Sequence, residues 1–394
     1  SEMCIRDRYL SVYIFIMLNI RLGGIMGKIR VGIVGVGNAA SALVQGVYYY
    51  KNVDENINIP GIAHVRLGSY HIGDIEFSIA FDVSKEKVGK DLSEAIFSYP
   101  NITPKFADIP KLGVVVRKGK VLDGVAEHMR ESFKPVDSDD DITLESIVGE
   151  LKETNTNVLV NLLPVGSEEA TRFYVKAALE AGVAFVNAIP VFIASDPEGY
   201  WPKLFKERNV PLLGDDVKGQ IGATILHRTL VRLLHMRGVR VKETYQLNVG
   251  GNTDFLNMTV EERLKSKRIS KTEAVTSILP YGKELEKEGK VRIGPSDYIP
   301  FLGNTKIAYI YIKGTSFANF PVTLEVKLTV DDKSMISGIL IDAIRSAKIA
   351  LDRGIGGIIV SPSAFFFKHP PVQAPDDETA RHWFEEFIRG VRER

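Results

Sequence analysis

The fold is decided by residues 29–40, which read IRVGIVGVGNAA. Residues 29–34 have the pattern of a buried strand, and a helical stretch follows the motif up to about residue 50. Between them lies G-x-G-x-x-A, in which Gly35 permits a tight turn, Gly37 lets the backbone approach a pyrophosphate and Ala40 allows close packing of helix on strand. The helix that opens at Asn38 and Ala39 offers unpaired N–H groups to phosphates. The stretch therefore predicts a dinucleotide-binding turn.

An acidic residue follows the next predicted strand. Residues 75–81 are mainly apolar and lead to Asp82, whose carboxylate would accept hydrogen bonds from the adenosine ribose of NAD and disfavour a 2′-phosphorylated cofactor. Asp82 lies farther from the glycines than the usual spacing of about 20 residues, so we interpret residues 53–73 as an insertion. The alternative is a plain glycine turn with Asp82 as a helix cap. The order of strand, helix and acid favours NAD.

Strands and helices alternate as far as residue 213. Further buried strands are predicted at residues 158–163, 184–187 and 210–213, with helices between them. Such alternation implies a parallel sheet with right-handed crossovers. The predicted fold class is therefore α/β, with a Rossmann-type doubly wound sheet.

The pattern changes near Gly222. The next predicted elements are a helix at residues 223–236 and strands at residues 240–249, 306–313 and 322–330, followed by helices at 335–353 and near 378–389. This is an α+β pattern inserted into the first domain. The predicted parts are a Rossmann domain at residues 26–222, an inserted α+β domain at 223–331 and a return to the Rossmann domain at 332–394.

The composition is that of an ordinary globular chain of 394 residues. Lys and Arg number 50 against 49 Asp and Glu, so no basic excess favours nucleic acid or an anionic membrane as partner. The solitary Cys4 allows neither an internal disulfide nor a cysteine-based zinc site, and fits a cytoplasmic protein. The apolar run at 9–20 is shorter than the roughly 20 residues that span a bilayer. We therefore interpret residues 1–25 as a mis-assigned leader ahead of Met26.

Polar residues follow two of the predicted strands. Asn161 and Pro164 come at the end of one, and Asn187 at the end of the next. Carboxyl ends of parallel strands line the ligand crevice of a Rossmann sheet, so these residues are candidates for cofactor contacts. Asn and Pro are also common turn formers, and the sequence leaves both interpretations open.

Two lysines are spaced for one helix face. Lys267 and Lys271 lie four residues apart, so a helix would hold both ammonium groups together. Like charges that are partly desolvated lower the pKa of a lysine, which yields a neutral amine for proton transfer beside a cation for a phosphate or enolate oxygen. The alternative is a solvated basic helix face. Asp215 and Asp216, after an apolar strand, could orient such lysines, bind a cation or cap the next helix.

Three motifs, in order, carry a family resemblance. They are GDDVKGQIGAT (214–224), NVGGNTDFLNM (248–258) and SKRISKTEAV (266–275). Together with the glycine turn they resemble the myo-inositol-1-phosphate synthases of the shorter prokaryotic and archaeal type, over residues 26 to about 368. The resemblance implies NAD-dependent, redox-neutral conversion of D-glucose 6-phosphate to 1L-myo-inositol 1-phosphate. It also implies that the inserted domain serves catalysis and builds a homotetramer.

The resemblance implies four chemical steps: oxidation at C5, enolisation at C6, aldol attack on C1 and reduction by the same NADH. Lys267 matches the lysine that assists both redox steps, and Lys271 its partner at the developing oxyanion. Lys306 and Lys368 match lysines that hold substrate oxygens and the phosphate. The matching acids are Asp216, Asp254 and Asp332, with Asp331 as the alternative to Asp332. The predicted cofactor-binding residues are Gly35, Gly37, Asn38, Ala39, Ala40, Asp82, Asn161, Pro164, Asn187 and Asp215.

Some features stay open. Gly219 stands where the family usually has a serine, so a hydroxyl contact is lost. Family members differ in needing a divalent cation, ammonium or potassium, and the seven histidines show no metal-binding spacing. The alternatives in function are an NAD-dependent dehydrogenase with an α+β substrate domain and a non-catalytic NAD-binding relative. The pathway served, whether inositol lipid, osmolyte or thiol precursor, is not determined by the sequence.

Overall fold

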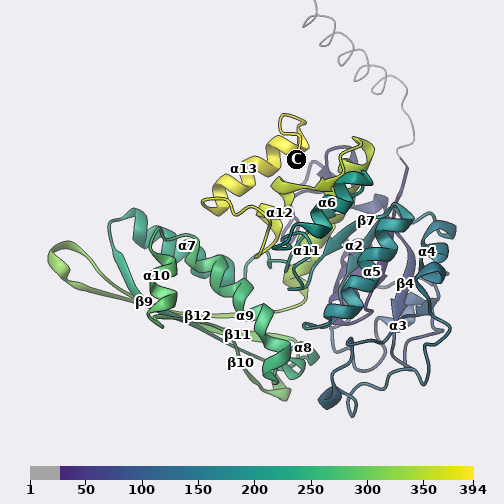
Figure 1. Ribbon diagram of the computed structural model, residues 1–394, viewed down its shortest axis with the longest axis horizontal. Helices are drawn as coiled ribbons and strands as arrows, with labels where there is room; N and C mark the ends of the chain where they lie inside the picture. Colours follow the sequence, from purple (N-terminus) through teal and green to yellow (C-terminus); the bar gives the residue numbers. More distant parts are fainter. Residues whose placement is uncertain (1–26) are drawn as a thin grey trace, which may run out of the picture.

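The first sheet, which lies on the right in Figure 1, is parallel throughout and has the strand order β13-β8-β7-β6-β1-β4-β5. Its strands are β1 (Ile29–Val34), β4 (Ile75–Asp82), β5 (Val116–Lys118), β6 (Val158–Asn161), β7 (Ala184–Asn187), β8 (Pro211–Leu213) and β13 (Gly357–Ile358). The chain runs outward from β1 to β5 and then resumes at β6, on the other side of β1. This change of direction is the point where a Rossmann sheet binds its ligand. The predicted fold class is confirmed.

The computed structural model describes residues 27–394. The predicted leader at residues 1–25, with Cys4, lies outside the described residues. Within residues 27–394 no helix combines the length and the apolar character needed to cross a bilayer.

Helices cover both faces of the first sheet. One face packs against α2 (Asn38–Tyr50) and α11 (Ser334–Asp352), and the other against α4 (Leu144–Glu153), α5 (Glu168–Ala181) and α6 (Tyr200–Glu207). Each interface is a cluster of buried aliphatic and aromatic side chains, such as Val44 with Ile344 on one face and Val175 with Phe185 on the other. The near-continuous burial of the strands requires such two-sided cover. The C-terminal part of the chain thus returns, through α11, to the sheet on which the chain began.

The glycine turn after β1 has the geometry that its sequence predicts. Gly35 has a φ of +89°, and a Cβ at this position would lie 2.8 Å from the carbonyl oxygen of Leu162. Gly37 precedes the first turn of α2, and a Cβ there would meet no atom within 4 Å. Gly35 is therefore required by the fold, whereas Gly37 leaves open space in front of the helix N-terminus.

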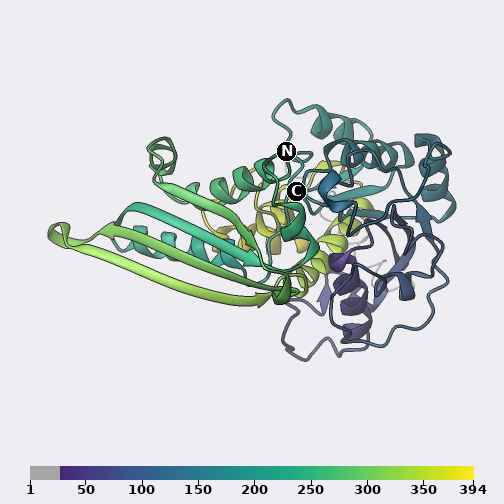
Figure 2. The same cartoon turned by 90° about the horizontal axis from the view of Figure 1, so that it is seen from below.

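The second sheet has the order β10-β9-β11-β12 and is antiparallel except for the pair β9 and β10. Its strands are β9 (Arg240–Gly250), β10 (Val291–Tyr298), β11 (Thr305–Thr315) and β12 (Pro321–Asp331). The helices α7 (Ala223–Met236), α9 (Glu261–Thr276) and α10 (Gly282–Lys287) pack on one face through a separate apolar cluster. Figure 2 shows the long strands extending away from the first sheet. These bounds support the predicted division at residues 222 and 331, which stays a prediction.

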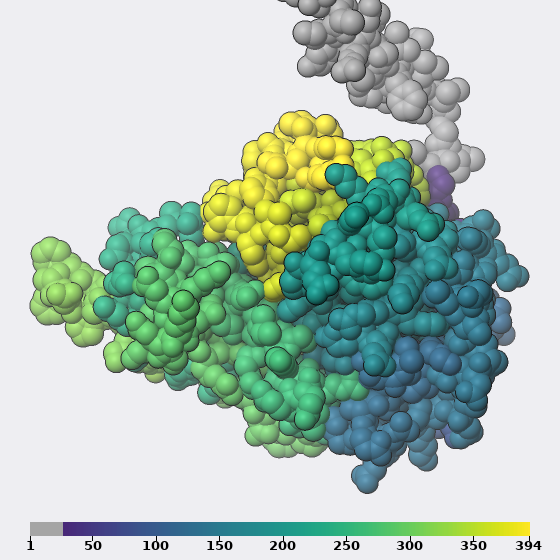
Figure 3. All heavy atoms as spheres, viewed as in Figure 1, coloured from purple at the N-terminus to yellow at the C-terminus, as the bar shows by residue number. Residues whose placement is uncertain are grey.

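Shorter elements fill the connections. They are β2 (Arg66–Leu67), β3 (Tyr70–His71), η1 (Ile72–Asp74), α3 (Leu92–Ala95), η2 (Glu127–Met129), α8 (Thr253–Asn257), η3 (Pro300–Leu302), η4 (Phe317–Asn319), α12 (Val360–Phe366) and α13 (Asp377–Ile388). The hairpin β2–β3 lies inside the segment 53–73, which had been interpreted as an insertion. The C-terminal residues, yellow in Figure 3, border both the teal part of the first domain and the green inserted part. The C-terminal segment therefore contacts both domains.

The Gly35→Ala variant tests the turn. A side chain at a φ of +89° beside a carbonyl oxygen should destabilise the cofactor-free protein by about 1 to 3 kcal/mol. The matched control is Gly46→Ala inside α2, where the new Cβ would lie 3.8 Å from a methyl of Ile341 and should stabilise by up to about 1 kcal/mol. Urea midpoints of both variants measure the difference. Equal midpoints would contradict the account of the turn.

Candidate active site

One cavity lies between the dinucleotide turn and the inserted domain. Its lining includes Gly35 and Gly37 from the turn and the amines of four lysines from distant parts of the chain. These lysines are Lys267, Lys271, Lys306 and Lys368. The cavity therefore joins a nucleotide-type turn to a concentration of positive charge.

Asp216 is the centre of the lysine cluster. Its Oδ1 accepts hydrogen bonds from Lys267 Nζ at 2.7 Å and Lys368 Nζ at 2.9 Å, and its Oδ2 accepts one from Ser270 Oγ at 2.6 Å. Burial alone would raise the pKa of this carboxyl, but the two ammonium groups outweigh burial and hold the pKa below its usual range. The carboxylate thus links α9 to the C-terminal segment around residue 368.

The elements that carry these residues are held by backbone hydrogen bonds. Lys368 N donates to Asp216 O at 2.7 Å, and Asp215 and His369 exchange two N–H···O bonds of 3.1 Å. Lys267 and Lys271 share a face of α9, as their four-residue spacing predicted. The loop after β8, the C-terminal segment and α9 are therefore fixed relative to one another.

Two of the lysines are poised to lose their proton. Burial, together with the charges of Lys306, Lys267 and Lys368, holds the pKa of Lys271 well below its ordinary value. Burial also lowers the pKa of Lys368, to about 7, although Asp216 opposes the shift. The cavity thus offers, at Lys271, an amine that loses its proton more readily than an ordinary lysine, beside the ion-paired Lys267. This combination suits proton transfer next to a developing negative charge.

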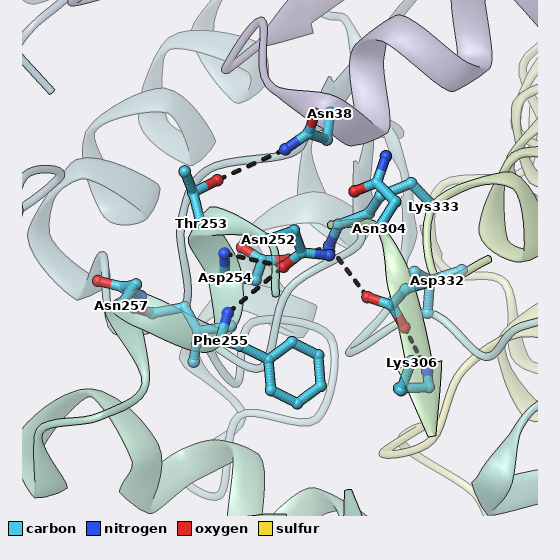
Figure 4. Close-up of polar contacts among 12 residues, drawn as sticks. Asn38, Asn252, Thr253, Asp254, Phe255, Asn257, Asn304, Lys306, Asp332 and Lys333 are labelled. Atoms are coloured by element: carbon cyan, nitrogen blue, oxygen red, sulfur yellow. Dashed lines mark hydrogen bonds and ion pairs between the residues drawn. The ribbon is translucent and has the colours of Figure 1, made fainter. Parts of the chain in front are cut away.

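A second chain of charges lies on the other side of the cavity. Asp332 pairs with Lys306 of β11 and with Lys333, whose Nζ lies 3.4 Å from Asp332 Oδ2, and Lys333 also pairs with Asp254 of α8 (Figure 4). Asp331, the alternative to Asp332, instead accepts hydrogen bonds from the backbone N–H groups that open α11. Asp332 therefore faces the cavity and Asp331 caps a helix. Sequence reasoning missed Lys333, although it directly follows the two acids.

The turn side of the cavity fits a dinucleotide. Asn38, Ala39, Asp82 and Pro164 line it, and the open space at Gly37 leaves room for a close backbone approach. Asp82 stands at the end of β4, where its carboxylate accepts hydrogen bonds from the backbone N–H groups of Val36 and Ser84. Ala40 is fully buried beneath the turn. These residues would hold the pyrophosphate and ribose of NAD.

Two residues near this turn have further partners. The side-chain Oδ1 of Asn38 accepts hydrogen bonds from the backbone N–H groups of Ile102 at 2.7 Å and Thr103 at 3.1 Å, so this side chain also braces the neighbouring loop. Lys87, which sequence reasoning missed, lines the cavity and donates to the carbonyl of Val36 at 2.8 Å. Burial lowers its pKa, and Asp82 opposes that shift. No motif marks Lys87 in the sequence.

Three predicted cofactor residues lie behind the cavity instead of lining it. Asn161 donates to Asn187 at 2.9 Å, and Asn187 donates to Asp215 at 2.7 Å. Asp215 is fully buried, which raises its pKa to about 6, and it also accepts from Ser195 Oγ at 2.8 Å. Ser195 in turn contacts His369 Nδ1 at 2.7 Å. These hydrogen-bonded residues adjoin Asp216 and Lys368, so they support the active site from behind and do not line the cavity.

Gly219, which stands where the family usually has a serine, lies close to Met335. A Cβ at this position would lie 3.2 Å from the Cβ of Met335, so a serine would press against the start of α11.

Among residues 27–394, no group of three or more His, Cys, Asp or Glu side chains is arranged to hold a metal ion.

Comparisons with known proteins show which family the chain resembles. A family model described as myo-inositol-1-phosphate synthase matches residues 222–333. An inositol-3-phosphate synthase of Mycolicibacterium smegmatis is 52% identical over 92% of this chain and 99% of its own length. The enzyme of the same name from Corynebacterium glutamicum is 52% identical over 91% of this chain and 98% of its own length.

The fold comparison points the same way. The crystal structure of a myo-inositol-1-phosphate synthase-related protein from Thermotoga maritima has 27% identity and a TM-score of 0.72, and the match covers 92% of this chain and 98% of that one. The sequence similarity to the Mycolicibacterium smegmatis enzyme extends over 365 residues, nearly the whole chain. The chain therefore belongs to the myo-inositol-1-phosphate synthase family.

Proposed function

We propose that this chain converts D-glucose 6-phosphate to 1L-myo-inositol 1-phosphate with NAD that is regenerated in each turnover. The observation that carries the proposal is the single cavity that joins the glycine turn to the four lysines. A phosphosugar would supply negative charge to this cluster of amines, and the turn would set a nicotinamide beside it. NAD, when bound, would take a hydride from C5 and return it after ring closure.

The protein's own residues would manage protons and charge. Lys267, ion-paired with Asp216, is assigned to the C5 oxygen during oxidation and reduction. Lys271, whose pKa burial holds well below its ordinary value, would accept a proton as the enolate forms and then, as an ammonium, stabilise the enolate oxygen. In the aldol step the C6 carbon attacks C1, and the C1 oxygen takes a proton as it becomes a hydroxyl.

The remaining lysines would hold the substrate. Lys306 and Lys368 are assigned to the phosphate and the substrate oxygens, and Asp216 and Asp332 keep their amines in place through ion pairs. A bound phosphate would offset the electrostatic repulsion between amines that lie close together. Asp254 would face substrate and cofactor from α8. The cytoplasmic location stays a prediction.

A redox-neutral assay tests this function. With glucose 6-phosphate and substoichiometric NAD, we expect many equivalents of inositol phosphate and no lasting absorbance of NADH at 340 nm. Stoichiometric NADH would instead support the dehydrogenase alternative. NAD binding with neither product nor NADH would support the non-catalytic alternative.

The Lys267→Ala variant separates chemistry from cofactor binding. Loss of this ammonium should lower kcat by on the order of 10² to 10⁴, whereas NAD affinity should stay within twofold because the ammonium of Lys267 is ion-paired with Asp216. Product assays and NAD titration by calorimetry measure the two quantities. Lys203→Ala, which removes an exposed partner of Glu207 on α6, is the control. Wild-type turnover by Lys267→Ala would contradict the role of Lys267.

Proton uptake tests the charge state of Lys368. At pH 8 an amine with a pKa of about 7 is mostly neutral, and a bound phosphate should raise that pKa, so binding should take up protons. Calorimetry of glucose 6-phosphate binding to the cofactor-free protein, in HEPES and in Tris, measures the uptake from the difference in heat. Lys368→Met should reduce this difference. Equal heats for the wild-type protein would show that Lys368 does not face the phosphate.

We also propose a homotetramer built through the inserted domain. The sheet face opposite α7 and α9 carries exposed apolar side chains, among them Tyr245, Leu247 and Tyr309, and the rings of Tyr245 and Tyr311 stack with centroids 4.9 Å apart. An apolar patch of this kind, continuous over neighbouring strands, favours burial against a second chain.

Light scattering tests the assembly. The wild-type protein should have four times the chain mass of 43.7 kDa, and the double variant Leu247→Lys with Tyr309→Lys should lower this mass because it places charge on the open face. Tyr200→Lys, on the exposed surface of α6, is the control and should leave the mass unchanged. A monomeric wild-type protein would refute the proposal.

A further inference from the structure

Lys333 lines the cavity beside the four lysines of the proposed reaction but has no role in that reaction. It lies in the short turn between β12 and α11, where the chain returns from the second sheet to the first domain. Its backbone is fixed on both sides, since its N–H donates to Asp331 and its carbonyl accepts from Ser337 Oγ at 3.1 Å. Only 7% of the residue is exposed, and it lines the cavity. The position of its side chain is therefore set by the fold.

Two carboxylates converge on the Lys333 ammonium. It forms an ion pair with Asp254 and lies 3.4 Å from Asp332 Oδ2, while the other oxygen of Asp332 pairs with Lys306 (Figure 4). Charges alternate along this chain from α8 to β11. Burial would lower the pKa of Lys333, but the two carboxylates outweigh it and raise the pKa above its ordinary value. The group is thus a permanent cation.

The same arrangement disfavours a free cation. Two carboxylates that point at one small space, from separate elements, would attract a metal ion or an ammonium ion if the space were empty. Here a tethered ammonium fills that space, and residues 27–394 offer no alternative cluster of three or more metal-binding side chains. The residues at this point of the cavity do not fit an additional ion.

Asp254 connects this cation to the dinucleotide turn. It belongs to the first turn of α8, and its neighbour Thr253 accepts a hydrogen bond of 3.5 Å from the amide of Asn38 (Figure 4). A shift of Asp254 would therefore move the contact between the inserted domain and the turn. Lys333 restrains that shift through a direct ion pair.

We propose that Lys333 is a positioning residue that serves as a built-in cation, holding Asp254 and Asp332 in place so that the enzyme needs no added mono- or divalent ion. This inference rests on the proposed function for its kinetic test alone. Its structural consequence is that shortening Lys333 creates a cation site that the wild-type protein lacks.

Cation dependence tests the proposal. The wild-type enzyme, dialysed against chelator into tetramethylammonium chloride, should keep its activity and should not respond to NH₄⁺, K⁺ or Mg²⁺. Lys333→Ala should lose activity on the order of 10²-fold, because Asp254 is no longer held, and should regain much of it with NH₄⁺ or K⁺ at constant ionic strength. Tetramethylammonium is too large to enter the space. A wild-type enzyme that requires an added ion would overturn the proposal, and this measurement needs no variant to fold.

A matched variant separates charge from volume. Lys333→Met removes the charge but fills the space, so it should lose activity like Lys333→Ala and should not be rescued by NH₄⁺. The surface control Lys203→Ala should behave like the wild-type protein. Rescue of both Lys333 variants, or of neither, would overturn the proposal, as would wild-type activity in Lys333→Ala.

Thermal unfolding gives a readout that does not depend on the reaction. Ions that bind only the folded state raise the unfolding temperature, so NH₄⁺ should raise that of Lys333→Ala above its value in tetramethylammonium and should leave the wild-type protein unchanged. If the wild-type chain made no inositol phosphate but the variant still showed this shift, the proposed function would fail and the built-in cation would stand. Absence of the shift would overturn the built-in cation.

Discussion

The buried carboxylate of Asp216 is the interaction on which the site depends. It accepts hydrogen bonds from Lys267 of α9 and from Lys368, which are about 100 residues apart in the chain, and it lies in a loop of the first domain. Removing a partner from a buried pair leaves an uncompensated charge, which costs about 3 to 5 kcal/mol. The loop of Asp216, α9 and the segment around Lys368 are therefore held together by an interaction whose loss would destabilise the protein.

The same carboxylate determines how the lysines differ. Lys267 and Lys368 share its charge, whereas Lys271 stands deeper among ammonium groups and has no hydrogen-bond partner in the described part of the chain. Desolvation lowers the pKa of a lysine and a neighbouring carboxylate opposes that shift, so the pKa of Lys271 falls well below its ordinary value, whereas Asp216 limits the fall at Lys368, whose pKa is about 7. Position relative to Asp216 thus gives identical side chains different tendencies to lose a proton. A reaction that alternates proton removal with stabilisation of an oxyanion needs an amine that releases its proton readily beside one that is held in an ion pair.

The sequence predicted the parts of this site that follow from local rules. The strand, glycine turn and helix at residues 29–50 are dictated by backbone geometry, and the four-residue spacing of Lys267 and Lys271 is sufficient to place both on one face of α9. Strand β10 was missed because Gly294 and Pro295 interrupt its pattern, which an edge strand tolerates. Helix α12 was missed because seven residues carry too little periodicity.

The direction in which each side chain points could not be predicted from the local sequence. Asn161 and Asn187 stand at strand ends as predicted, yet both are fully buried and form a series of hydrogen bonds that leads to Asp215. Nothing local distinguishes Asp331, which caps α11, from Asp332, which faces the cavity. Only the resemblance of the motifs indicated that Lys306 and Lys368, ordinary lysines in sequence, belong to the site.

The inserted domain explains why the site is built from so many segments. The chain leaves the first domain after the loop of Asp216 and returns at Lys333, so the two ends of the insertion lie beside the glycine turn. An ion pair at each end, Asp216 with Lys267 and Lys333 with Asp254, ties the insertion to the first domain. Because both pairs border the cavity, the forces that orient the domains and those that orient the catalytic amines are the same. A cavity formed in this way exists only when both domains are folded and docked, which limits the chemistry to the complete protein.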